Sequence, residues 1–228
     1  MTHWGADRPR RRLPGRWPRL ATGSRGQSLV EFSLVFPVFL VIFLAVIEFA
    51  FVFNAQLSIN FATRDAALIA AEAGNAVGAD CVILAKVDQD VTAPANRAQI
   101  QTVKIFWTNS VGDPLDTSGN VTTMGAASQA INSYTRGGST TCTFVDGSTQ
   151  TVSYTLVGTA RYVDVNRCND LAGSSAGCQA GHATLDTVAV QVTYLDTWRT
   201  PLHNLIGPLG ISGWTLGQTN EMRMEPVL

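Results

Sequence analysis

Charged residues and histidines are scarce in this chain. Only 14% of its 228 residues are charged, and its three histidines, His3, His182 and His203, lie far apart in the sequence. A zinc site needs ligands at closer spacing, and acid–base catalysis needs a recognisable group of titratable side chains. We therefore expect no metal, no other cofactor and no enzymatic activity.

Positive charge is sparse over most of the chain and concentrated at its N-terminus. Residues 1–26 hold seven of the 16 basic residues and one of the 17 acidic residues, so the remainder is clearly acidic. Arginines directly before an apolar segment keep a loop on the cytoplasmic side of a membrane. We interpret residues 1–26 as a cytoplasmic leader and expect no nucleic-acid partner.

One long hydrophobic run follows the basic residues, over residues 32–53. As a helix, its 22 residues rise roughly 33 Å, close to the hydrocarbon thickness of about 30 Å. A cleaved secretory signal has a shorter apolar region, followed directly by a cleavage site of small residues. The run therefore predicts a single-pass protein of the cell membrane, in contact with lipid, whose C-terminal domain lies outside the cytoplasm.

Two carboxylates accompany the hydrophobic run. Glu48 lies inside it, where an ionised acid costs a few kcal/mol. We expect Glu48 to reach toward the outer interface or to be protonated. Glu31 lies at the cytoplasmic edge, where water can solvate its charge.

The junction between leader and hydrophobic run reads SRGQSLVEF over residues 24–32. It resembles the prepilin processing site of type IV pilins, and is most similar to TadE-type minor pilins of the tight-adherence (Tad/Flp) pilus system. In that family a prepilin peptidase cuts after a glycine, and a glutamate is the fifth residue of the new chain. The resemblance implies cleavage between Gly26 and Gln27, with removal of the leader and with Glu31 as the fifth residue.

The resemblance also implies a role for Glu31 in assembly. Cleavage creates a free amine at Gln27, which would pair with the Glu31 carboxylate of a neighbouring pilin subunit and set axial register. Such a pair is strong where the dielectric constant is low. The resemblance covers residues 27–73 and 186–226, whereas residues 80–180 match no pattern of the family.

The outer part of the chain predicts an α+β fold. We expect the N-terminal helix to continue over residues 27–73 and to pack on an antiparallel sheet, as in pilins. Leu57, Phe61 and Leu68, with Ala62 and Ile69, recur at helical spacing. Asp146-Gly147 predicts a hairpin turn. The outer domain, residues 74–228, is expected to contain a short helix at 80–91 and strands at 101–108, 140–145, 149–165, 187–195 and 214–224.

The four cysteines, Cys81, Cys142, Cys168 and Cys178, all follow the hydrophobic run. In an oxidising compartment they predict two disulfides, with three possible connectivities. The short loop between Cys168 and Cys178 favours that pair, leaving Cys81 for Cys142.

The resemblance implies a structural role, as a minor pilin or pseudopilin whose partners are the prepilin peptidase, other pilin subunits and the Tad secretion machinery. An alternative is a signal-anchored binding domain that uses the polar loops 109–125 or 166–183 and never enters a filament. A third possibility is a tethered hydrolase using Ser175 within GSSAG. It is disfavoured because this motif lies in a loop between cysteines, without the required strand before it and helix after it.

Overall fold

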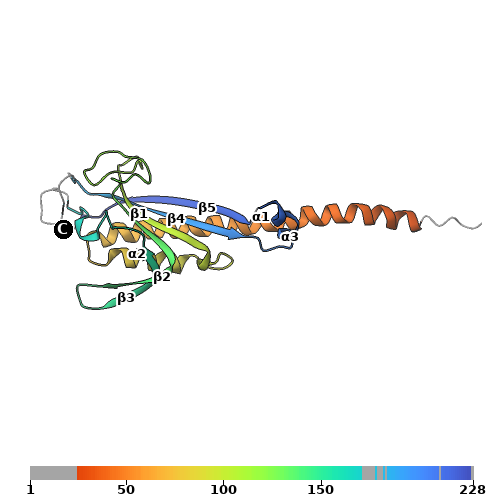
Figure 1. Ribbon diagram of the computed structural model, residues 1–228, viewed down its shortest axis with the longest axis horizontal. Helices are drawn as coiled ribbons and strands as arrows, with labels where there is room; N and C mark the ends of the chain where they lie inside the picture. Colours follow the sequence, from red (N-terminus) through yellow and green to blue (C-terminus); the bar gives the residue numbers. More distant parts are fainter. Residues whose placement is uncertain (1–24, 171–177, 179–181, 183, 211, 227–228) are drawn as a thin grey trace, which may run out of the picture. The chain divides into compact units, whose positions relative to one another are not determined.

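The computed structural model describes residues 25–226 except 171–177, 179–181, 183 and 211, so the leader lies outside the described residues. A long N-terminal helix and a five-stranded antiparallel sheet confirm the expected α+β class (Figure 1). The chain divides into two compact units, residues 1–41 and 42–228.

Helix α1 spans Arg25–Ala73, so it ends at the residue that the sequence predicts. Gly74 has a φ of 54°, a left-handed conformation that stops a helix and favours glycine. Among the described residues, α1 is the one helix long and apolar enough to cross a membrane. This finding is consistent with a single-pass membrane protein.

The sheet has the strand order β3-β2-β1-β4-β5, and every neighbouring pair is antiparallel. Its strands are β1 (Ile100–Thr108), β2 (Ile131–Thr143), β3 (Thr149–Leu156), β4 (Thr187–Thr197) and β5 (Gly213–Arg223). The shorter elements are α2 (Ala79–Asp90), η1 (Arg97–Gln99), η2 (Asp164–Asn166), α3 (His203–Ile206) and η3 (Gly207–Leu209). The predicted hairpin joins β2 to β3.

Two predicted strand boundaries are wrong. β2 begins at Ile131 instead of residue 140. The sequence pattern missed its first half because an irregularity between Arg136 and Thr140 interrupts the register of β2 with β3. Gly137, at a φ of 109°, lies in this bulge and hides the strand pattern. β3 ends at Leu156 instead of residue 165, and Gly158 at positive φ turns the chain away from the sheet.

The predicted packing residues of α1 are only partly correct: Ala62 is buried in the core and Ile69 packs against it. Leu57, Phe61 and Leu68 are exposed, whereas a parallel set of mostly small residues is buried against the sheet and α2. The buried positions of α1 that belong to the hydrophobic core are Ala55, Ile59, Ala62, Ala66, Ala67 and Ala70. Both sets recur at helical spacing, and the small side chains let the helix lie close to its neighbours.

β4 runs alongside the second half of α1 (Figure 1). The N–H of Glu225, just beyond β5, donates to the carbonyl of Ala71, and the N–H of Arg199, just beyond β4, donates to Glu48. The helix rises roughly 35 Å from Glu48 to Ala71, and an eleven-residue strand spans about 36 Å. The connection from β4 to β5 therefore lies at the Glu48 end of the sheet.

Candidate functional site

The predicted processing site lies in the first turns of α1. The side-chain amide of Gln27 donates a hydrogen bond of 3.0 Å to Glu31, and both residues are exposed. Gly26 has ordinary helical backbone, and a Cβ built there would meet nothing within 4 Å. The fold therefore does not require glycine at position 26.

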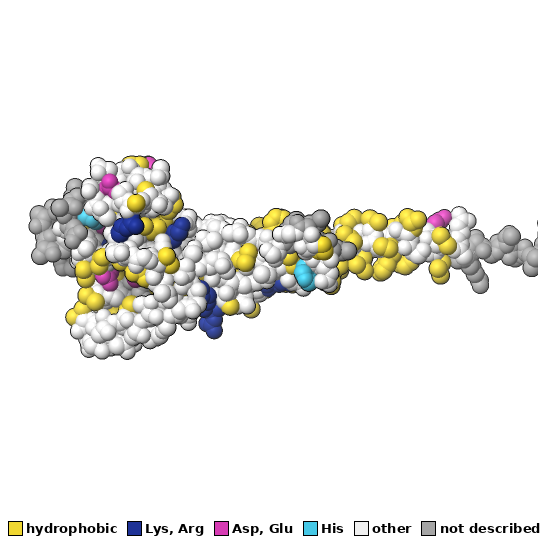
Figure 2. Space-filling view, viewed as in Figure 1, with side chains coloured by type: hydrophobic (Ala, Val, Ile, Leu, Met, Phe, Trp, Pro, Cys, Tyr) yellow, Lys and Arg dark blue, Asp and Glu magenta, His cyan; other side chains and the backbone are white. Residues whose placement is uncertain are grey.

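Exposed apolar side chains cover α1 from the junction to residue 41. They include Leu29, Phe32, Leu34, Phe36 and Phe39, and the rings of Phe32 and Phe36 stack with centroids 5.2 Å apart. Figure 2 shows hydrophobic side chains gathered along this part of the helix. Apolar surface of this extent needs lipid or protein around it.

A second apolar surface lies on the part of α1 that packs against the sheet. Phe49, Phe53, Leu57 and Phe61, which we name the outer stripe, are 72%, 57%, 43% and 59% exposed. They are spaced four residues apart and so share one helix face. The core does not need these four side chains, because the buried residues of α1, which are mostly alanines and which we name the alanine face, form the contact with the rest of the core.

Glu48 is buried and its carboxylate is bound by backbone N–H groups. Its side chain is 3% exposed, and its two carboxylate oxygens accept the N–H groups of Arg199 and Thr200, each at 2.9 Å. Two such charge-assisted hydrogen bonds replace water around a buried carboxylate. The sequence marked Glu48 as out of place, but no local spacing could identify partners more than 150 residues away.

Arg199 strengthens this contact through its own side chain. Its guanidinium lies 5.2 Å from the centre of the Phe51 ring and donates to the carbonyl of Pro94. It also lies 3.5 Å from the buried carboxylate of Asp196, at the end of β4. The start of the β4–β5 connection is thereby fixed to α1 at the level of Glu48.

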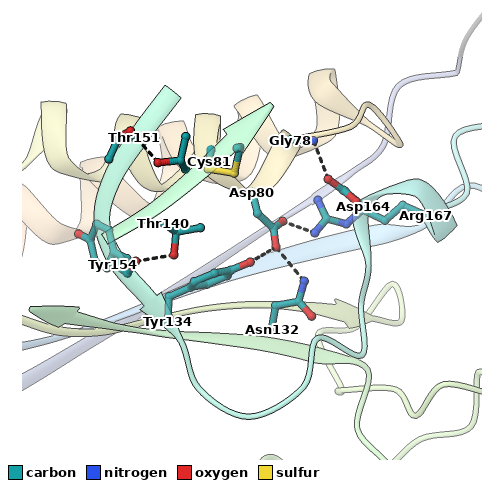
Figure 3. Close-up of a disulfide and its surroundings, with 12 residues drawn as sticks. Gly78, Asp80, Cys81, Asn132, Tyr134, Thr140, Thr151, Tyr154, Asp164 and Arg167 are labelled. Carbon is teal, nitrogen blue, oxygen red and sulfur yellow. Dashed lines mark hydrogen bonds and ion pairs between the residues drawn. A yellow bond between two sulfur atoms is a disulfide. The ribbon is translucent and has the colours of Figure 1, made fainter. Parts of the chain in front are cut away.

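At the other end of the sheet, a buried ion pair joins α2 to the segment after β3 (Figure 3). Arg167 is fully buried and donates to Asp80, whose second oxygen accepts from Asn132 at 2.7 Å and from the Tyr134 hydroxyl at 2.6 Å. The N–H of Gly78 donates to Asp164 at 2.7 Å. Burial, together with the Asp80 charge, raises the pKa of Tyr134 well above its usual range.

The two disulfides flank this ion pair in sequence. Cys81, next to Asp80, is bonded to Cys142 of β2, and Cys168, next to Arg167, is bonded to Cys178. This is the pairing that loop length favours. The enclosed residues 171–177, including Ser175 of the hydrolase-like motif, lie outside the described residues.

His182 forms a contact that the sequence analysis missed. Its Nδ1 lies 2.5 Å from Asp186, and its ring stacks on Trp107 with centroids 3.8 Å apart. Asp186 also accepts the Tyr162 hydroxyl and the Cys168 N–H. The four-residue spacing of His182 and Asp186 was the available signal. Because Asp186 binds three groups of the fold, the His182–Asp186 pair stabilises the segment that leads into β4. Among the described residues there is no cluster of side chains that could hold a metal ion.

Comparison with known proteins finds a similarity that begins at the predicted processing junction. Residues 26–68 match the family model described as TadE-like protein. This match confirms, for that segment, the resemblance seen in the junction, and it is consistent with a protein associated with the tight-adherence pilus. No curated protein and no solved structure matches the chain.

Proposed function

We propose that this chain is a minor pilin or pseudopilin of a Tad-type pilus. In this proposal a prepilin peptidase cuts between Gly26 and Gln27, and the chain then assembles with other pilin subunits. Before cleavage, the leader lies in the cytoplasm and residues 74–228 lie outside it. The proposed role is structural and includes no catalysis. The match of residues 26–68 to the TadE-like model, which begins at the predicted cleavage site, is the observation that carries it.

The geometry of the junction supports cleavage and register. The Gly26–Gln27 peptide bond is on an exposed turn of α1, with open space around Gly26. Glu31 is exposed one turn later, and Gln27 already contacts it through its side chain. A neighbouring subunit could therefore present its new amine to the same carboxylate.

The outer stripe favours assembly over a solitary anchored domain. A membrane-spanning helix needs about 20 residues, which from Glu31 would end near residue 50. Phe53, Leu57 and Phe61 come later and are still exposed. A binding domain alone in water gains nothing from this apolar face, whereas helices of neighbouring subunits could bury it.

Mass spectrometry of the protein extracted from membranes tests the proposal. In cells that contain the peptidase, the mature chain is expected to begin at Gln27, and Gly26→Val is expected to keep the leader. Gly217→Val, at an exposed β5 glycine whose Cβ would also meet nothing within 4 Å, is the matched control and should be processed normally. An N-terminus at Met1, while other prepilins are cut in the same cells, rules the proposal out.

The alternative, an anchored binding domain, is favoured by one observation. Val111 and Val121 are strongly exposed in the polar loop between β1 and β2. Co-purification with pilus subunits supports the pilin; a monomeric domain that binds a ligand through this loop supports the alternative.

A further inference from the structure

The start of the β4–β5 connection is attached to α1 at one defined residue, Glu48. The Arg199 and Thr200 N–H groups are bonded to Glu48, which fixes the level of the connection on the helix. In the sequence, Glu48 is the 17th residue after Glu31 and the 23rd after Arg25. A helix needs about 20 residues to cross a bilayer. If the helix crosses a bilayer, Glu48 therefore comes at the outer interface.

Two tryptophans lie at this end of the sheet. Trp214 is 49% exposed at the start of β5, and its ring lies 5.8 Å from that of half-buried Trp198, which directly precedes Arg199. Trp214 pairs in register with Asp196 of β4. A Cβ on the preceding Gly213 would come within 2.3 Å of the Asp196 carbonyl, so glycine permits the close approach of the strands that holds Trp214 in place.

Tryptophan is the side chain most suited to a membrane–water interface, because its large apolar ring carries one polar N–H. We propose that Trp198 and Trp214, with the exposed start of the β4–β5 connection at Pro201 and His203, form a foot that rests in the headgroup layer of the outer leaflet. The Glu48 contact ties this foot to α1, so the sheet and the helix enter the interface together. This contact with lipid precedes assembly and does not depend on cleavage of the leader.

The chemistry of the foot indicates which lipid feature it recognises. Arg199, which directly follows Trp198, already contacts Phe51, Pro94 and Asp196. The indole rings are therefore the groups that meet the membrane, and zwitterionic phosphatidylcholine should suffice. A neighbouring subunit is the other candidate for this surface, and it is an outcome of the test below.

Quenching of tryptophan fluorescence by brominated lipid tests the inference. The full chain, with leader residues Trp4 and Trp17 replaced by phenylalanine, is reconstituted in vesicles of phosphatidylcholine brominated on its acyl chains. Its emission is expected to be quenched, and Trp198→Phe/Trp214→Phe is expected to lose most of that quenching. The remaining Trp107 is buried at the opposite end of β4, near Thr187, and provides an internal control for folding.

Two results overturn the inference. One is emission that brominated lipid leaves unchanged in a correctly inserted chain, which means that water or protein covers the foot. The other is quenching that persists in the double variant. If processing at Gly26 fails but quenching occurs as expected, the pilin proposal falls and the membrane foot stands.

Discussion

The carboxylate of Glu48 accepts the backbone N–H of Thr200 at 2.9 Å, across 152 residues of sequence. The adjacent N–H of Arg199 binds the other oxygen of the same carboxylate. A residue that seems misplaced in an apolar helix is thus the point at which the end of the sheet is attached to that helix.

Replacing Glu48 should release the start of the β4–β5 connection. Glu48→Ala leaves two N–H groups without their acceptor, and each such group costs about 1–3 kcal/mol when buried. Hydrogen exchange at the Arg199 and Thr200 amides should become much faster in this variant. Glu48→Gln, which keeps one acceptor oxygen, should give an intermediate rate. Unchanged exchange in Glu48→Ala would show that the attachment does not depend on the carboxylate.

Removing the carboxylate at position 31 should affect assembly alone. We expect Glu31→Ala to insert in the membrane and to be cut after Gly26, because the residue is exposed and no core contact depends on it. Its incorporation into pili should fall, as measured by immunoblotting of sheared pili. Glu72→Ala removes an exposed carboxylate near the other end of α1 and serves as the control. Normal piliation in Glu31→Ala removes the proposed role.

A polar residue in the outer stripe should separate folding from assembly. Phe61 is exposed, so Phe61→Ser should change the free energy of unfolding by no more than about 0.5 kcal/mol. Crosslinking to other pilus subunits in cells should decrease strongly. Val145→Ser, at the exposed tip of the β2–β3 hairpin, should leave crosslinking intact. Equal crosslinking in both variants contradicts a role of the stripe in assembly.

Breaking the Asp80–Arg167 pair should destabilise the fold severely. Asp80→Ala leaves the guanidinium of fully buried Arg167 without its carboxylate, which typically costs about 3–5 kcal/mol. Denaturant unfolding of the detergent-solubilised chain measures this loss. Asp65→Ala, which removes an exposed partner of Lys86, should cost at most about 1 kcal/mol.

A double variant provides a further check on this pair. Asp80→Asn/Arg167→Met removes both charges and should recover much of the stability lost in Asp80→Ala. A double variant as unstable as Asp80→Ala would mean that packing, and not the unpaired charge, determines the loss.

Tyrosine ionisation should report unfolding at alkaline pH. Burial raises the pKa of all four tyrosines of the chain, Tyr134, Tyr154, Tyr162 and Tyr194. Since the folded pKa values lie above the unfolded value of about 10, their contribution to stability is complete below pH 10 and decreases as the pH rises further. Tyrosinate absorption should therefore appear only together with loss of circular dichroism. Ionisation near pH 10 in a chain that keeps its circular dichroism contradicts this assignment.

Local sequence patterns determined the features that depend on neighbouring residues. The apolar run from 32 to 53, uninterrupted between 34 and 47, is sufficient to predict a helix able to span a membrane, and Asp146-Gly147 is sufficient for the hairpin turn. The resemblance of residues 24–32 to a prepilin processing site could be recognised for the same reason, because Gly26 and Glu31 are separated by a fixed, short spacing. The short loop between Cys168 and Cys178 likewise favoured the observed disulfide.

Tertiary structure alone decided which face of α1 turns inward and what binds Glu48. The alanine face and the outer stripe have the same helical period, so periodicity could not show which of them packs against the sheet. The alanine face packs there because its small side chains fit closely against the sheet and α2. The partners of Glu48 and Asp80 come from distant segments, Arg199–Thr200 and Arg167, that only the sheet topology brings near. Local spacing carries no information about such pairs, because their proximity arises when the strands align along the helix.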